Sequence, residues 1–80
     1  MKLPRNLSGA DLIKALKVLS YSVTRQAGSH IRLTTEMNGT HHITIPNHDP
    51  LKVRNLSAIL GDIALHFNKS KEDLIQLLWK

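Results

Sequence analysis

Residues 21–45 read YSVTRQAGSHIRLTTEMNGTHHITI, and apolar and polar side chains alternate along most of them. A period of two is typical of β-strands that bury one face. The pattern predicts three strands, at residues 21–26, 30–35 and 42–45. Gly28 and Ser29 are expected to form a tight turn between the first two, and Pro46 ends the third because proline has no N–H to donate to a ladder. The side chains expected to face inward are Tyr21, Val23, Ile31, Leu33, Ile43 and Ile45.

The loop between the second and third strands follows from the requirement that directly opposed residues share a face. A two-residue turn at Asn38-Gly39 would place Leu33 opposite Thr44 and mix apolar with polar side chains. A three-residue loop of residues 37–39, with Gly39 in the left-handed conformation next to a bulge, places Leu33 opposite Ile43 instead. The open face of the sheet is then predicted to carry His30, Arg32, Thr34, His42 and Thr44.

Apolar residues with the spacing of a helix flank this stretch on both sides. Ser8 is expected to cap a first helix, with Asp11 completing a capping box, and this helix ends near Leu19. Asn55 is expected to cap a second helix and Ser70 a short third one. The order α-β-β-β-α-α predicts an α+β domain, a three-stranded antiparallel sheet with helices on one face.

Length and composition restrict the class of protein. The 80 residues form one small domain, with residues 1–7 expected to be a leader to a domain at residues 8–80. The absence of cysteine excludes a disulfide scaffold, a thiol nucleophile and a cysteine zinc site. No apolar run approaches the roughly 20 residues of a membrane span, so we expect a cytoplasmic protein with no membrane partner.

The charge is unevenly distributed along the chain. Eleven Lys and Arg against six Asp and Glu give a net charge of +5. Residues 1–32 contain six basic side chains and one acidic one, whereas residues 33–80 contain five of each. A basic half on a small domain suggests a polyanionic partner, most often nucleic acid. The alternative is a basic surface that serves solubility alone.

The side chains suited to chemistry are five histidines, His30, His41, His42, His48 and His66. There is no glycine-rich phosphate loop, no nucleophile elbow and no zinc-binding helix motif. His41 and His42 should point to opposite faces of a strand, so no metal site is predicted. His66 is expected to lie at a helix end. His30 opens a strand on the open face and is the candidate acid or base, with an idle surface histidine as the alternative.

The run RQAGSH at residues 25–30 resembles the Arg-Gln-x-Gly-Ser-His signature of the HicA (YcfA-like) toxins, small mRNA interferases of bacterial and archaeal toxin–antitoxin pairs. Residues 12–16, LIKAL, are similar to the family's first helix, and residues 45–48, IPNH, to its Ile/Val-Pro-x-His motif. Further matches to the family lie in the stretch that leads into the second helix, at Leu51, Lys52, Leu56, Ile59 and Leu60. The resemblance covers residues 8–78 in order. The chain departs from the family at Arg54-Asn55, where a Gly-Thr pair is usual.

The resemblance implies a double-stranded-RNA-binding-domain-like fold and a metal-independent endoribonuclease that cleaves mRNA and needs no cofactor. It implies that His30 is the catalytic residue. One histidine cannot be base and acid at once, so His48 or a water is the candidate for the second role. The residues expected to contact RNA are Arg25, Gly28, Ser29, Arg32, Lys52 and Arg54. Four of these are cations, and among the four only Arg25 and Lys52 fall on positions that match the family. Gly28 would allow close approach of the RNA backbone or a neighbouring strand.

The resemblance also implies a partner, a HicB-type antitoxin that inhibits the toxin in a hetero-oligomer. The main alternative is a non-catalytic module that binds double-stranded RNA, which needs Lys and Arg but no histidine. His30 after Gly28-Ser29 favours the enzyme, because a binding module has no use for a titratable group there. A DNA-binding transcription factor is a weaker alternative, because the strands offer no recognition helix pair.

Overall fold

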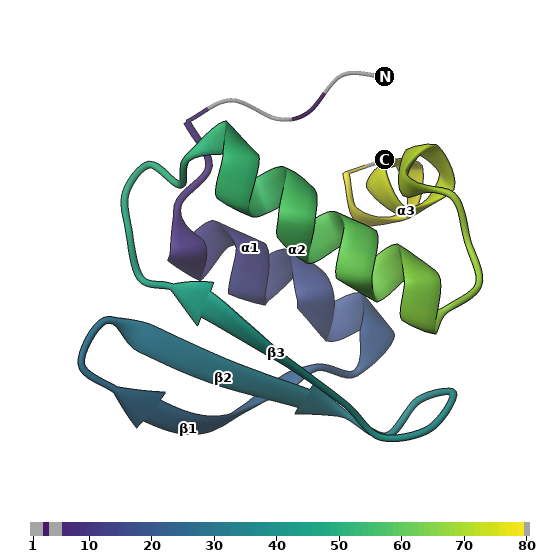
Figure 1. Ribbon diagram of the computed structural model, residues 1–80, viewed down its shortest axis with the longest axis horizontal. Coiled ribbons are helices and arrows are strands. Elements are labelled where there is room, and N and C mark those ends of the chain that lie inside the picture. Colours follow the sequence, from purple (N-terminus) through teal and green to yellow (C-terminus); the bar gives the residue numbers. More distant parts are fainter. Residues whose placement is uncertain (1–2, 4–5, 80) are drawn as a thin grey trace.

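The computed structural model describes Leu3 and residues 6–79. Its elements are α1 Gly9–Ala15, the 3-10 helix η1 Leu16–Leu19, β1 Ser22–Ala27, β2 His30–Thr35, β3 His41–Pro46, α2 Val53–His66 and α3 Lys71–Leu78. The antiparallel sheet has the order β1-β2-β3. In Figure 1 the sheet forms one layer, α1 and α2 lie across the same side of it, and α3 packs beside α2. The predicted α+β class and the α-β-β-β-α-α layout are confirmed.

The apolar face of the sheet and the inner faces of the helices enclose one core. Its members include Leu12 and Leu16 from the first helical segment, Leu33 and Ile45 from the sheet, and Leu60 from α2, all 0% exposed. Of the expected leader, Met1, Lys2, Pro4 and Arg5 lie outside the described residues, while Leu3 and Leu7 pack against the core. Within the described residues, no helix combines the length and apolarity needed to cross a membrane.

Two of the three predicted helix caps are confirmed. The Ser8 hydroxyl accepts from the Asp11 N–H at 3.0 Å while the Asp11 carboxylate accepts from the Ser8 N–H at 3.1 Å, which closes the capping box. The Ser70 hydroxyl accepts from the Asp73 N–H at 3.0 Å. Each pair satisfies backbone donors that a helix start leaves free.

The predicted cap at Asn55 is wrong, because α2 begins at Val53 and Asn55 lies inside its first turn. The Lys52 carbonyl accepts from the Leu56 N–H at 3.0 Å, and no side chain caps this end. The early start follows from burial of Leu51, whose N–H donates to the Leu7 carbonyl at 2.7 Å and fixes the chain just before the helix. Asn55 therefore lies in the first turn of α2 with its side chain free of a capping role.

The predicted register between β2 and β3 is confirmed. Leu33 pairs with Ile43 and Ile31 with Ile45 on the buried face, while the open face pairs Arg32 with Thr44 and Thr34 with His42. Gly39 has the expected positive φ of 94°, and Asn38 before it has a φ of 59°. Opposed residues thus share a face, as the apolar pattern requires.

Val23 lies on the apolar face of the sheet, as predicted, but it is not buried there. It pairs with Leu33 and so shares the apolar face, but 51% of its surface is exposed. The reason is that the helices pack over β3 rather than over β1. A bulge between Val23 and Arg25 also interrupts the ladder at Thr24, whose hydroxyl lies 2.9 Å from that of Thr34.

A polar network joins the sheet to the C-terminal half of α2. The Tyr21 hydroxyl lies 2.7 Å from Nδ1 of His41, and Nε2 of His41 lies 3.3 Å from the Asp62 carboxylate. Assigned from these partners, His41 carries its proton on Nε2 and accepts from Tyr21. His66, at the C-terminal end of α2 as expected, stacks on His41 at 4.3 Å and donates from Nε2 to the Met37 carbonyl at 2.9 Å. Both histidines therefore have structural partners.

At the other end of the sheet, backbone hydrogen bonds hold the segment that follows β3. The Asn47 N–H donates to the Ser29 carbonyl at 2.6 Å, which fixes the segment to the β1–β2 turn. The Gly9 N–H donates to the His48 carbonyl at 2.9 Å, which fixes it to the start of α1. A Cβ on Gly9 would lie 2.6 Å from the Pro46 carbonyl oxygen, so only glycine permits this approach. His48 is thereby held next to the turn that precedes His30.

The titration of Tyr21 tests the polar network. Burial, and then the nearby Asp62 carboxylate, raise the pKa of Tyr21 from 10.0 to about 12. Because the folded-state pKa is raised, the neutral hydroxyl contributes stability that is fully present below pH 10 and is lost as pH rises toward 12. Tyr21 is the one tyrosine in the chain, so tyrosinate absorbance reports it alone, with Tyr21→Phe as the blank. A midpoint near 10 in the folded protein would contradict the burial of this hydroxyl.

Substitution of two glycines tests the packing at Gly9. Alanine is the better helix former by about 1 kcal/mol, so propensity alone predicts that Gly9→Ala stabilises. The contact with the Pro46 backbone predicts destabilisation by about 1–3 kcal/mol in chemical unfolding. Gly61→Ala is the matched control, because its Cβ meets only the flexible end of Lys71. We expect that control to be neutral or stabilising. Equal effects of the two substitutions would show that α1 does not pack closely against this segment.

Candidate functional site

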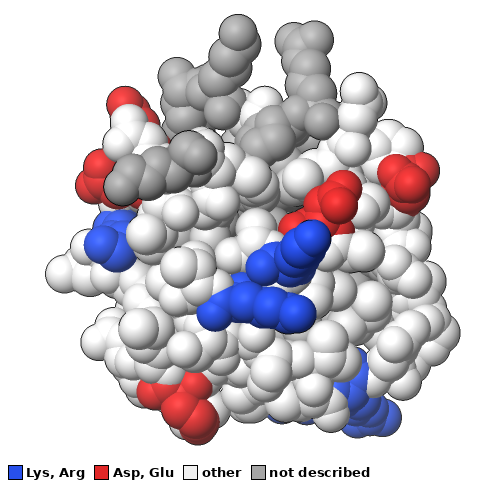
Figure 2. Space-filling view, turned by 180° about the vertical axis from the view of Figure 1, so that it is seen from behind, with Lys and Arg blue, Asp and Glu red and all other residues white. Residues whose placement is uncertain are grey.

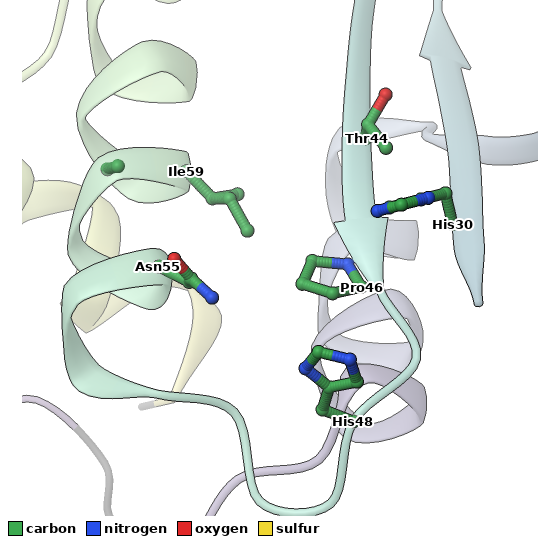
Figure 3. A pocket seen from close by; sticks show the side chains of 7 residues that line it. His30, Thr44, Pro46, His48, Asn55 and Ile59 are labelled. Carbon is green, nitrogen blue, oxygen red and sulfur yellow. The ribbon is translucent and has the colours of Figure 1, made fainter.

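A pocket of about 360 Å³ opens where β3 ends and α2 begins. One side is formed by the ends of two strands and the following segment, through His30, Thr44, Pro46 and His48. The other side is the first two turns of α2, through Asn55, Ala58 and Ile59. Figure 3 shows the two imidazoles on either side of Pro46, with Asn55 and Ile59 facing them from the helix. The pocket thus joins residues that are distant in the sequence.

The β1–β2 turn determines where His30 lies. Ala27 pairs with His30, so Gly28 and Ser29 form a two-residue turn, as predicted, and Gly28 has a positive φ of 59°. A Cβ on Gly28 would meet nothing within 4 Å, so the expected close approach of a neighbouring strand is wrong. Glycine is favoured here by its backbone conformation. His30 then opens β2 directly opposite Pro46 and lies exposed at the pocket.

His48 comes to the same pocket from an irregular segment. Its backbone N–H bonds to the Pro46 carbonyl at 2.9 Å, and its carbonyl is held by Gly9. Its side chain is exposed, like that of His30. The structure therefore brings both candidate imidazoles to one pocket, on either side of Pro46. Neither imidazole forms a side-chain hydrogen bond with another described residue, in contrast to His41, His42 and His66.

Two of the predicted RNA-contacting cations lie together on the open face of the sheet. Arg25 pairs with Arg32, which pairs with Thr44 at the pocket, so the three residues form one row across the strands. The strands contain no Asp or Glu, and within the described residues neither arginine forms an ion pair. Directly opposed like charges are unfavourable in a sheet unless an anion lies over them. We call Arg25 and Arg32 the arginine row.

The other predicted contacts divide between two places. Lys52 and Arg54 lie exposed at the N-terminal end of α2, near Asn55, but neither lines the pocket. Ser29 is exposed in the turn before His30. Seen from behind, the molecule shows Lys and Arg side chains among uncharged and acidic ones, without a basic patch that spans that face (Figure 2). The net charge is thus not concentrated on that side.

Sequence reasoning missed the side of this pocket that α2 forms. Asn55 was assigned to a cap, although the departure from the usual Gly-Thr pair marked it as unusual. Ala58 and Ile59 lie one turn further along α2, and the sequence singles out Ile59 only as a match that leads into this helix. No local pattern indicates that these positions face His30, because the contact depends on how the helix crosses the end of the sheet.

The arrangement suits acid–base chemistry on an anion. Two exposed imidazoles can accept and donate a proton at one pocket. The arginine row beside them can hold a phosphate and stabilise charge that develops during a reaction. Among the described residues, no group of three His, Cys, Asp or Glu side chains is placed to hold a metal ion.

Comparison with known proteins gives one result. The family model described as HicA toxin of bacterial toxin-antitoxin matches residues 9–65, which span the first helix, the sheet and nearly all of α2. No curated protein and no solved structure matches the chain. The matched region contains every residue of the pocket and the arginine row. The chain therefore belongs to the HicA toxin family and is the toxin of a toxin–antitoxin pair.

Proposed function

We propose that this toxin is an endoribonuclease that cleaves mRNA in the cytoplasm and so inhibits translation. The observation that carries the proposal is that His30 and His48, from separate segments, line one pocket beside the arginine row. RNA is a polyanion that carries its own nucleophile, the 2′-hydroxyl. An acid, a base and fixed cations are therefore enough to cleave it.

In the proposed reaction one imidazole takes the proton of the 2′-hydroxyl. The 2′-oxygen attacks the adjacent phosphorus, the bond from phosphorus to the 5′-oxygen breaks, and the second imidazole gives a proton to that oxygen. The products are a 2′,3′-cyclic phosphate and a 5′-hydroxyl, so atoms and charge balance without a further reactant. His30 takes one of these roles and His48 the other.

The phosphate is held by groups around the imidazoles. Arg25 and Arg32 hold the phosphates that pass over the open face, and the Ser29 hydroxyl donates to the one nearest His30. The open surroundings of Gly28 allow the RNA backbone to approach the turn. Lys52 and Arg54 contact a neighbouring phosphate at the start of α2, where the helix dipole also favours an anion.

A purely RNA-binding module explains the arginine row but not the histidines. Such a module reads the shape and phosphates of a duplex, for which lysine and arginine suffice. His30 and His48 have no structural partner among the described side chains, whereas the three other histidines do. We therefore favour catalysis over binding alone.

We further propose that the antitoxin partner is of the HicB type and inhibits by covering His30. A domain of this size has no long lid loop of its own within the described residues. The surface around His30 is cationic, which favours rapid association with an acidic partner. Covering the pocket would exclude RNA without any change in the toxin's fold.

Replacement of His30 tests the function directly. His30→Ala should change the free energy of unfolding by less than about 0.5 kcal/mol, because the side chain is exposed. Cleavage of a defined single-stranded RNA should fall at least ~10²-fold. His42→Ala is the matched control, an exposed histidine on the same face that lies outside the pocket. Full cleavage by the His30 variant would exclude this chemistry.

The same pair of variants can be tested in cells. Expression of the wild-type chain and of His42→Ala should arrest growth, expression of His30→Ala should not, and a co-expressed HicB-type antitoxin should restore growth. Arrest by all three chains alike would show that toxicity does not depend on the pocket.

The salt dependence of RNA binding tests the arginine row. The measurement uses the His30→Ala protein, because this variant should bind RNA without cleaving it. The logarithm of its binding constant for RNA should fall linearly with the logarithm of the salt concentration. A second substitution, Arg32→Ala, should make that slope less steep by about 0.7 for each phosphate that the arginine neutralises in the parent protein. Lys69→Ala, an exposed cation in the α2–α3 connection, is the control and should leave the slope unchanged. A slope that Lys69→Ala lowers as much as Arg32→Ala would mean that binding reflects net charge alone.

A further inference from the structure

A phosphate next to the two imidazoles does not explain the composition of the rest of the pocket. Its lining includes no Lys or Arg, and the arginine row lies outside it, beyond Thr44. Three lining residues, Pro46, Ala58 and Ile59, are apolar. A phosphate gains nothing from such walls, whereas the flat face of a nucleobase does. The volume of about 360 Å³ lies at the small end of the range for ligand pockets, which suits one base rather than a duplex.

Asn55 is the residue in this pocket best suited to reading a base. It lies in the first turn of α2, half-buried, and its side chain makes no capping hydrogen bond. No hydrogen bond joins its amide to another described residue. In Figure 3 the side chain extends from the helix toward the imidazoles across the pocket. A carboxamide presents a donor beside an acceptor, which matches the hydrogen-bonding edge of a nucleobase, whereas a phosphate offers acceptors alone.

We propose that the pocket between β3 and α2 holds one base of the RNA and that Asn55 reads its edge, which gives cleavage a base preference. The inference rests on the proposed ribonuclease function. His30 is both a lining residue and a member of the open face that carries Arg32. The nucleotide whose base enters the pocket therefore places its phosphate next to His30 and the arginine row. The base read by Asn55 belongs to a nucleotide at the cleaved bond.

Cleavage of an RNA library with randomised sequence tests the proposal. The wild-type chain should show a base preference at one position next to the cut. Asn55→Ala should reduce that preference about tenfold, the discrimination expected of one paired amide, while still cleaving RNA. Asn55→Asp keeps the shape but removes the donor and should alter the preference. Gln76→Ala, a carboxamide on α3 outside the pocket, is the matched control. A wild-type chain without a preference, or a preference that Asn55→Ala leaves intact, would overturn the proposal.

A binding measurement separates failure of this inference from failure of the proposed function. Nucleoside monophosphates should shift the side-chain amide resonances of Asn55 in NMR spectra of the wild-type protein, and ribose 5-phosphate, which has no base, should not. This result would support the base pocket even if the chain cleaved no RNA, in which case the ribonuclease function alone would fail. Equal shifts with both ligands, or none with either, would overturn the base pocket while leaving cleavage by His30 untouched.

Discussion

The candidate site depends on how the segment after β3 is fixed. The Asn47 N–H bonds to the carbonyl of Ser29, and the His48 carbonyl accepts from Gly9 at the start of α1. These two bonds connect three parts of the chain that are distant in sequence, and they place His48 beside the turn that precedes His30. The approach of α1 is so close that residue 9 has no room for a side chain. The positions of the two candidate imidazoles thus depend on backbone contacts.

The histidines divide into those whose rings have hydrogen-bond partners and those whose rings have none among the described residues. At one end of the sheet His41 and His66 stack on each other and bond to Tyr21, Asp62 and the Met37 carbonyl, which joins strand, helix and loop. At the other end His30 and His48 are exposed and lack such partners among the described residues. A satisfied imidazole stabilises the fold, whereas one without protein partners remains available to a substrate. Histidines therefore stabilise the fold at one end of this small domain and are left exposed at the other.

Much of the fold could be predicted because its elements follow local rules. The helix caps at Ser8 and Ser70, the two-residue turn at Gly28 and the β2–β3 register each depend on neighbours in the sequence or on opposed strands. The exposure of Val23 could not be predicted, since it depends on which strands the helices cover. The start of α2 was missed because the tertiary burial of Leu51 overrides the preference of Asn55 for a cap. The same error left Asn55 out of the predicted site, whereas the signature at residues 25–30 indicates His30 from the sequence alone, and the structure brings that residue to the pocket.

The central claim is that His30 and His48 work together as acid and base on RNA. It is tested most directly by the rate of single-turnover cleavage as a function of pH, measured for the wild-type chain and for His48→Ala. The account predicts a bell-shaped profile for the wild type, because one imidazole must be neutral and the other protonated. In His48→Ala the rate should fall, and one limb of the bell should disappear. A variant that keeps the wild-type rate and both limbs would show that His48 takes no part and would contradict the account.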